Sequence, residues 1–316
     1  VHYKALEFQA KKDFQKTKDP IYSNEVSRCH NIQWAKKISL NSAYGAIGNQ
    51  YFRFYNVNQA SAITSAGQFV IQYIEEKVNK YVNDILQTKD KIDYIVASDT
   101  DSIYLCLDKL VEKFCKDKTK EQKLNFVDKV AKGKIEPFIE KCFEEIADYT
   151  NAFQQKMVMK REVIADKGIW TAKKRYMLNV LDEEGFRFEE PKLKIMGIEA
   201  VKSSTPEVCR VAIKEAIRLI MNKDEEALHT YINDFKKTYN AYQPEQIAFP
   251  RSCNNLRKYS SSSSIFIKGS PIHIKGSLIY NWHLKNQNLD QRYPLIQEGD
   301  KIKFILLKEP NPFKFN

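Results

Sequence analysis

Apolar residues three and four positions apart predict helices along much of the N-terminal half of the chain. The spacing indicates one helix before a polar break at residues 18–20 and a second from residue 23 or 24 to about residue 43. It then predicts a long helix over residues 58–86 that packs into a core. The stretch 108–156 is mostly helical and charged, so we expect it to cover a sheet.

Short runs of β-branched and aromatic residues predict strands in the middle of the chain. Residues 157–165 form one expected strand, and residues 169–180 and 186–188 flank an expected turn at 182–185. Thr205 is expected to cap the next helix, with Pro206 as its first residue. An α-hairpin and then a region of short strands and loops follow, at residues 207–221, 224–239 and 244 onward.

The stretch 94–107 has the most informative pattern, because two apolar runs flank the polar residues Asp99-Thr100-Asp101-Ser102. This pattern predicts a β-hairpin, and the apolar run 105–107 predicts that its second strand is buried on both faces. Carboxylates at the bend suit Mg²⁺, and two such ions about 4 Å apart can clamp a phosphoryl transfer. The same four residues also suit an ordinary turn, so the pattern leaves both interpretations open.

Composition changes this picture mainly through charge. The 316 residues carry a net charge of +11 and are 43% hydrophobic, which indicates a folded protein with a polyanionic partner such as nucleic acid. No run approaches about 18 apolar residues, so no membrane span is expected. The six cysteines and five histidines show no ligand spacing for zinc. The chain begins with Val1, and we expect it to be a piece of a longer polypeptide.

Several polar side chains are candidates for binding. Lys37, Asn41 and Tyr44 follow Gln33 at steps that place them on one stripe of a helix, which suits a nucleoside triphosphate above a base pair. An exposed amphipathic face explains the stripe equally well. Glu162 is a candidate metal ligand, although pairing with its basic neighbours is the simpler explanation.

Two basic segments are candidates for contact with a nucleic-acid backbone. Strand alternation would send Lys174 and Tyr176 to one face and Arg175 to the other. A basic strand edge that prevents aggregation is the alternative. Residues 202–205 precede a helix start and offer a phosphate site formed by Lys202, Ser203, Ser204 and Thr205.

Three motifs in the same order resemble those of family B DNA polymerases. They are Lys37-x-x-x-Asn41-Ser42-x-Tyr44-Gly45, Asp99-Thr100-Asp101-Ser102, and Lys174-Arg175-Tyr176. Within that family, the residues of these motifs are similar to those of the replicative polymerases of T-even-type bacteriophages. The resemblance runs from near residue 1 to about residue 313.

This resemblance implies an α+β fold with a right-hand architecture. Residues 1–49 would be the C-terminal part of the fingers, 50–197 the palm with its antiparallel sheet, and 198–316 an incomplete α-helical thumb. The implied function is DNA-directed DNA polymerase activity, in which two Mg²⁺ ions assist deoxynucleotidyl transfer to a primer 3′-hydroxyl. The implied setting is the cytoplasm of an infected bacterial host.

The resemblance also assigns roles to the candidate residues. Asp99 and Asp101 are implied to be catalytic, with Asp101 and Glu162 at the metal site. Lys37, Asn41 and Tyr44 would bind the dNTP. The primer–template DNA would contact two segments, namely Lys174, Arg175 and Tyr176 and then Lys202, Ser203, Ser204 and Thr205.

One departure from the family pattern limits these expectations. The first palm aspartate motif is missing and would lie N-terminal to Val1, and the exonuclease motifs and the clamp-binding tail are missing too. We therefore expect the remaining polymerase segments and a sliding clamp as partners, and we expect the isolated chain to be inactive. The alternative function is a non-catalytic nucleic-acid-binding module. The Asp-Thr-Asp tip and the helix stripe disfavour a reverse transcriptase-like palm.

Overall fold

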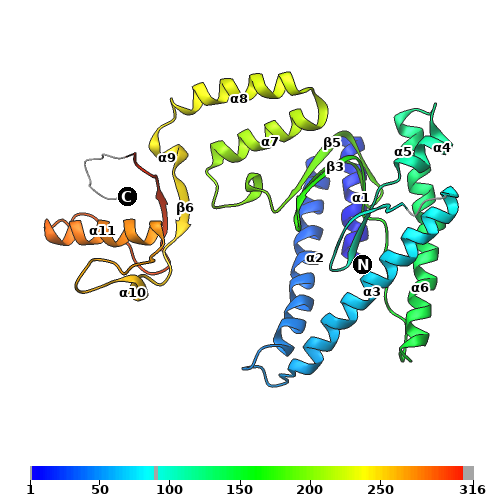
Figure 1. Cartoon of the computed structure of the whole chain (residues 1–316), viewed down its shortest axis with the longest axis horizontal. Coiled ribbons are helices and arrows are strands. Elements are labelled where there is room, and N and C mark those ends of the chain that lie inside the picture. The colour runs from blue at the N-terminus through cyan, green and yellow to red at the C-terminus, as the bar shows by residue number, and fades with distance from the viewer. Residues whose placement is uncertain (1, 89–91, 309–316) are drawn as a thin grey trace. The chain divides into compact units, whose positions relative to one another are not determined.

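The computed structural model describes residues 2–88 and 92–308 (Figure 1). The chain divides into two compact units. The first comprises Val1–Asp166 and Asn179–Lys192, and the second comprises Lys167–Leu178 and Leu193–Asn316. Among the described residues, no helix is both long and apolar enough to cross a bilayer.

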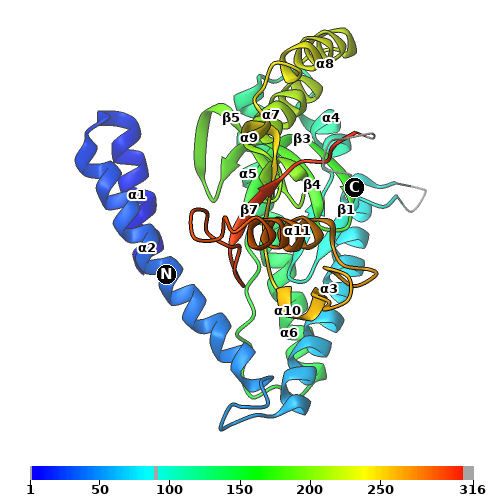
Figure 2. The ribbon, with the colours of Figure 1, turned by 90° about the vertical axis from the view of Figure 1, so that its left-hand side faces the viewer.

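The first unit begins with two helices that pack side by side, α1 (His2–Thr17) and α2 (Pro20–Ile47). Asp19 caps α2, because its side chain accepts a hydrogen bond of 2.9 Å from the backbone N–H of Ile21. The predicted start of the second helix at residue 23 or 24 is therefore wrong, since Pro20 is tolerated in a first helical turn. The C-terminal part of α2 extends beyond α1 (Figure 2).

The long helix α3 (Val57–Leu86) confirms the prediction from apolar spacing. Its buried stripe of Val70, Ile74, Val78, Val82 and Leu86 packs with helices α4 (Asp108–Cys115) and α6 (Glu136–Tyr149) in the main core of this unit. Helix α5 (Lys120–Val130) continues through a π-helical turn (Ala131–Ile135) into α6. The expectation of a mostly helical stretch is confirmed for residues 108–149, and that these helices cover a sheet stays a prediction.

The predicted hairpin consists of β1 (Ile95–Asp99) and β2 (Ser102–Leu105), which pair antiparallel. The register pairs Asp99 with Ser102, so the turn has two residues. Burial of the second strand on both faces is wrong, because all four residues of β2 are only half-buried. Within the described residues this sheet has two strands, so each of them is an edge strand.

Strands β3 (Val163–Ala172), β4 (Arg175–Glu183) and β5 (Phe186–Met196) form a three-stranded sheet in chain order. The turn at 182–185 is confirmed in outline, because residues 184 and 185 connect β4 to β5. Two strand predictions are wrong. Glu162 precedes β3 rather than lying inside a strand, and the stretch 169–180 is interrupted by a turn at residues 173–174.

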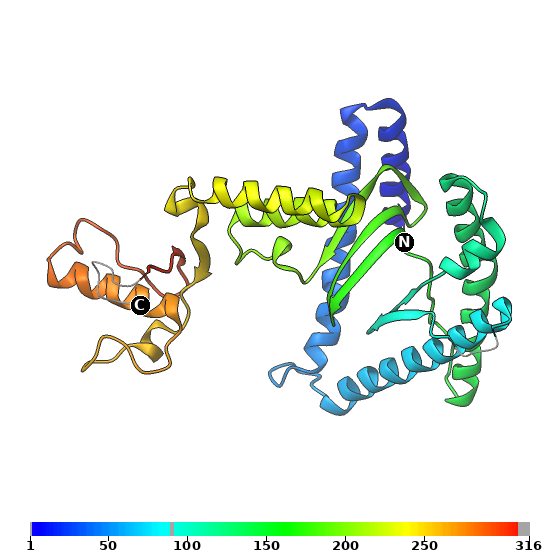
Figure 3. The ribbon, with the colours of Figure 1, turned by 45° about the horizontal axis from the view of Figure 1, so that its top comes forward.

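The second unit contains the helical hairpin of α7 (Glu207–Asn222) and α8 (Glu225–Tyr239), as predicted (Figure 3). The predicted cap is wrong, because Pro206 occupies the N-cap position and α7 has no side-chain capping bond. The remaining elements are a short 3₁₀ helix, η2 (Glu199–Val201), then α9 (Pro244–Ile247), β6 (Phe249–Ser252), α10 (Leu256–Tyr259), α11 (Ile272–Asn286) and β7 (Lys301–Phe304). Helix α11 falls where only strands and loops were expected.

Candidate functional site: acidic hairpin and basic segments

The acidic residues of the hairpin lie at a strained turn. Asp99 is the half-buried last residue of β1, and Asp101 is exposed in the turn itself. The backbone N–H of Asp101 donates to the carbonyl oxygen of Asp99 at 2.6 Å. Thr100 between them has a φ of 55°. A β-branched residue rarely adopts this left-handed conformation, and such strain clusters at functional sites.

The oxygen atoms of this hairpin suit a hard divalent cation. Asp99 and Asp101 supply carboxylates, and near the base of the turn the Ser98 hydroxyl donates to Glu75 of α3 at 3.0 Å. Within residues 2–88 and 92–308, however, no group of three His, Cys, Asp or Glu side chains is arranged to hold a metal ion. The residues fit Mg²⁺ by the type of donor atom alone. Water and substrate oxygens would fill the remaining coordination positions of the ion.

Glu162 is exposed and lies directly before β3. Its carbonyl oxygen accepts a 2.6 Å hydrogen bond from the backbone N–H of Glu184, in the turn between β4 and β5. The neighbouring Arg161 is 8% exposed, and its guanidinium forms ion pairs with Asp128 and Asp182. This buried network, which the sequence did not reveal, attaches the backbone beside Glu162 to α5 and to β4.

Lys37, Asn41 and Tyr44 are all exposed and lie in the C-terminal half of α2. The ammonium of Lys37 lies 6.0 Å from the centre of the Trp34 ring, one turn earlier on the same helix. Gln33 does not share this exposure. It is half-buried, and its amide donates to the carboxylate of Glu7 in α1.

Glu7 is a buried carboxylate that connects the first two helices, a role that the pattern of residues did not suggest. Its side chain is 5% exposed and lies 2.6 Å from the ammonium of Lys11 and 3.5 Å from Nδ1 of His30. Lys11 lies on α1 itself. The contacts that fix the position of α2 against α1 are therefore those of Glu7 with His30 and Gln33. The exposed residues 37–44 begin one turn further along α2.

The turn between β3 and β4 carries the first basic segment. Lys174 lies in this turn with a φ of 61°, so the predicted alternation of Lys174 and Tyr176 on one strand face is wrong. Tyr176 lies in β4, and its ring stacks on Trp170 with centroids 6.2 Å apart. Gly197, with a φ of 68°, places its backbone directly against the carbonyl oxygen of Lys174.

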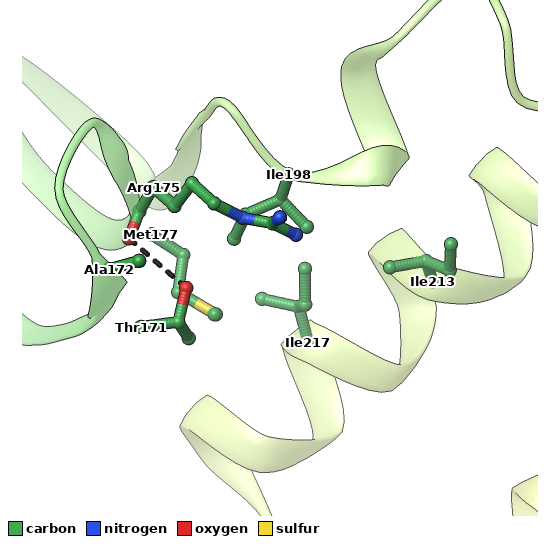
Figure 4. Close-up of a pocket in the computed structure, with 7 residues that line it drawn as sticks. All are labelled: Thr171, Ala172, Arg175, Met177, Ile198, Ile213 and Ile217. Carbon is green, nitrogen blue, oxygen red and sulfur yellow. Dashed lines mark hydrogen bonds between the residues drawn. The ribbon is translucent and has the colours of Figure 1, made fainter.

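Arg175 begins β4 and borders an open apolar pocket of about 380 Å³ (Figure 4). The hydroxyl of Thr171 donates to the carbonyl oxygen of Arg175 at 3.2 Å, which closes the turn. The other walls of the pocket are apolar and come from β3, β4, residue 198 and helix α7, through Ala172, Met177, Ile198, Ile213 and Ile217.

Glu199 joins the two basic segments, a role that the sequence did not suggest. Its carboxylate lies 2.5 Å from Nη2 of Arg175 and 3.0 Å from the ammonium of Lys202. The hydrogen bond from Lys202, followed by a backbone hydrogen bond and the charge of Arg175, lowers the pKa of Glu199. Ser203 is exposed beside this group, whereas Ser204 and Thr205 are half-buried in the turn that precedes α7. A spacing of three residues between Glu199 and Lys202 was the one signal of it in the sequence.

Comparison with known proteins identifies the family of this chain. A model of DNA polymerase family B matches residues 7–312. The DNA-directed DNA polymerase of Enterobacteria phage T4 is 40% identical over 291 residues, which cover 89% of this chain and 32% of the phage protein. That of Escherichia phage RB69 is 42% identical over 288 residues, covering 88% of this chain and 31% of the relative.

A more distant relative is DNA polymerase 1 of Aeropyrum pernix, which is 23% identical over 278 residues, or 84% of this chain and 23% of the archaeal protein. The chain thus spans about a third of the length of the two phage relatives. Because the family model matches nearly the whole sequence, the chain belongs to the family B DNA polymerases.

Proposed function

We propose that this chain is part of a DNA-directed DNA polymerase that adds deoxynucleotides to a primer 3′-hydroxyl under the direction of a template. The observation that carries the proposal is the two-residue turn of the β1–β2 hairpin, which places Asp99 and Asp101 two positions apart at a strained bend. Family membership and the names of the two phage relatives support it.

The proposed acidic site consists of Asp99, Asp101 and Glu162. Of these, Asp101 and Glu162 would hold Mg²⁺, which would stabilise negative charge as the 3′-hydroxyl attacks the α-phosphate and pyrophosphate leaves. The chain itself would contribute the positions of these acidic residues. The hairpin register holds Asp99 opposite Ser102, and the Glu184 N–H holds the backbone of Glu162. The palm motif that would add another aspartate is not in this sequence.

The exposed residues of α2 are proposed to bind the incoming dNTP. Lys37 would contact the triphosphate as a point charge, while Asn41 and Tyr44 would face the nascent base pair. In the second unit, Lys174, Arg175 and Tyr176 would contact the primer end, and residues 202–205 would contact the duplex backbone. The division into fingers (1–49), palm (50–197) and thumb (198–316) belongs to the same proposal.

We further propose that the isolated chain binds primer–template weakly and does not extend it. The remaining polymerase segments, and a sliding clamp in the complete enzyme, would be its partners in a phage-infected bacterial cell. A non-catalytic nucleic-acid-binding module is the second candidate. The observation that favours it is the lack of a complete three-ligand metal group among the described residues.

Binding of Mn²⁺, which replaces Mg²⁺ at carboxylate sites, tests the proposal. The purified chain is titrated with Mn²⁺ in the presence of primer–template and a dNTP, and bound metal is measured by electron paramagnetic resonance. We expect weak binding that Asp101→Ala removes and Asp117→Ala, at another exposed acidic residue, retains. DNA binding without any Asp101-dependent metal binding would favour the non-catalytic module. Primer extension by the isolated chain would contradict its proposed inactivity.

A further inference from the structure

Glu199 lies between two cations that come from different parts of the second unit. Arg175 is the first residue of β4, and Lys202 follows η2. The side chains of Arg175, Glu199 and Lys202 are 41%, 46% and 42% exposed, so all three are accessible to solvent. A glutamate carboxylate is charged at neutral pH, and the two cations favour this charged form further, because they lower the pKa of Glu199.

Stability does not explain this arrangement well, because exposed ion pairs contribute little to folding. The arrangement does resemble the way proteins bind a phosphate group. A guanidinium offers paired N–H donors, an ammonium adds a point charge, and both point at oxygens of one anion. In this structure the anion is the carboxylate of Glu199.

The surrounding backbone holds the three residues independently of their ion pairs. The flanking residues Ile198 and Ala200 are buried at 8% and 0% exposure, which anchors the backbone of Glu199 and leaves its side chain outside. The Thr171 hydroxyl holds the backbone of Arg175, and Gly197 packs against the turn next to it. The backbone positions of Arg175 and Glu199 therefore do not depend on the ion pairs, and both cations could turn to another anion if the carboxylate moved away.

We propose that Arg175 and Lys202 form a binding site for one backbone phosphate of DNA, and that Glu199 occupies this site until a phosphate displaces it. The inference rests on the proposed function, because it takes the partner to be DNA. Glu199 is thus a built-in competitor that weakens binding and releases both cations when a DNA phosphate takes its place. A phosphodiester group can do so, since its two non-bridging oxygens accept from both donors at once, as the carboxylate does.

The test compares Glu199→Gln with the unchanged chain. The substitution keeps the size of the side chain and removes the competing charge. The probe is a fluorescent DNA duplex with a recessed 3′ end, and affinity is measured by anisotropy over a range of salt concentrations. We expect Glu199→Gln to bind roughly three- to tenfold more tightly at low salt, because one competing anion is gone. The slope of log K against log[salt] should become steeper by about 1.

Glu215→Gln is the matched control, because it removes the same charge from an exposed acid that pairs with Arg218 at 3.1 Å on α7. It should change affinity less than about twofold. In a Lys202→Ala background, Glu199→Gln should lose most of its effect, since one of the two released cations is absent. Thermal unfolding of each variant verifies that the fold is retained.

Two results overturn the inference in different ways. If Glu199→Gln weakens DNA binding, or changes it no more than Glu215→Gln does, then Glu199 is not a competitor at this site while the proposed function stands. If the unchanged chain shows no salt-dependent binding to the duplex at all, the proposed function fails and the inference fails with it.

Discussion

The backbone of Gly197 lies so close to the carbonyl oxygen of Lys174 that a Cβ atom on residue 197 would overlap that oxygen. Gly197 also has a φ of 68°, a backbone conformation that is unfavourable for residues other than glycine. The β3–β4 turn and the segment leading to Glu199 are therefore held together by a contact that only glycine permits. Both basic segments of the second unit depend on it for their relative position.

Gly197→Ala should destabilise the chain by more than about 1 kcal/mol, because it combines a steric overlap with an unfavourable φ. The measurement is urea-induced unfolding followed by circular dichroism. Gly276→Ala is the control, since Gly276 lies exposed in α11 with no described atom within 4 Å of an added Cβ. That change should raise stability by about 0.5–1 kcal/mol. Equal effects of the two substitutions would contradict the close approach at Gly197.

The buried guanidinium of Arg161 is expected to be costly to remove. Arg161→Met leaves Asp182, whose side chain is 1% exposed, without its main cation, and Asp128 loses a partner too. Loss of one partner from a buried ion pair costs about 3–5 kcal/mol. Lys120→Met is the control, because Lys120 pairs with Asp166 at 2.9 Å while 62% exposed. Its loss should cost less than about 1 kcal/mol in the same unfolding assay.

The ion pairs of Asp128 with Arg161 and Lys132 predict that the fold loses stability in acid. Burial alone would raise the pKa of Asp128, but hydrogen bonds from Lys132 and Arg161 outweigh burial and lower it below its ordinary value of 3.8. A carboxyl group with a lowered pKa in the folded state stabilises fully above its unfolded pKa, and that stabilisation is lost as the pH falls through the folded pKa.

The measurement for this prediction is the free energy of unfolding at several pH values from 7 down to about 2, for the unchanged chain and for Asp128→Asn. The difference in the free energy of unfolding between the unchanged chain and Asp128→Asn should stay constant above about pH 5 and shrink below about pH 4. A difference that grows on acidification would mean that Asp128 is not held by its cations.

Lys36 and Lys37 are adjacent exposed lysines, but only Lys37 is proposed to bind the dNTP. The ammonium of Lys36 lies 5.2 Å from the centre of the Tyr3 ring on α1, whereas that of Lys37 lies near Trp34. With primer–template present, Lys37→Ala should weaken binding of a dNTP about tenfold, because a phosphate contact is lost. Lys36→Ala should have less than a twofold effect. Titration of a fluorescent dNTP measures both, and equal losses would place the triphosphate elsewhere.

Local pattern was sufficient for the long helix α3 and for the hairpin that carries the proposed acidic site. Helix α3 follows from apolar residues at helical spacing, and the hairpin follows from two strand-like runs around a polar turn. Asp99 and Asp101 are neighbours for the same reason. These predictions succeeded because the residues that decide each element lie within a few positions of one another.

Elements whose conformation depends on packing were harder to predict. Helix α11 begins with alternating apolar and polar residues, a strand-like pattern, yet Ile274 is buried in a core with Cys253 and Leu256. Tertiary packing overrides weak local preference in such a segment. The position of Lys174 in a turn likewise depends on how β3 and β4 pair, which alternation along one strand does not reveal.

The sequence by itself determined the family, the main helices and the acidic hairpin, because motifs and periodicity are properties of neighbouring residues. The tertiary structure decided which distant charges meet. Arg161 pairs with Asp182 and Arg175 pairs with Glu199, although each of these charges had many possible partners along a chain with 51 basic and 40 acidic residues. The physical reason is that an ion pair depends on distance in space, which only the packing of strands and helices sets.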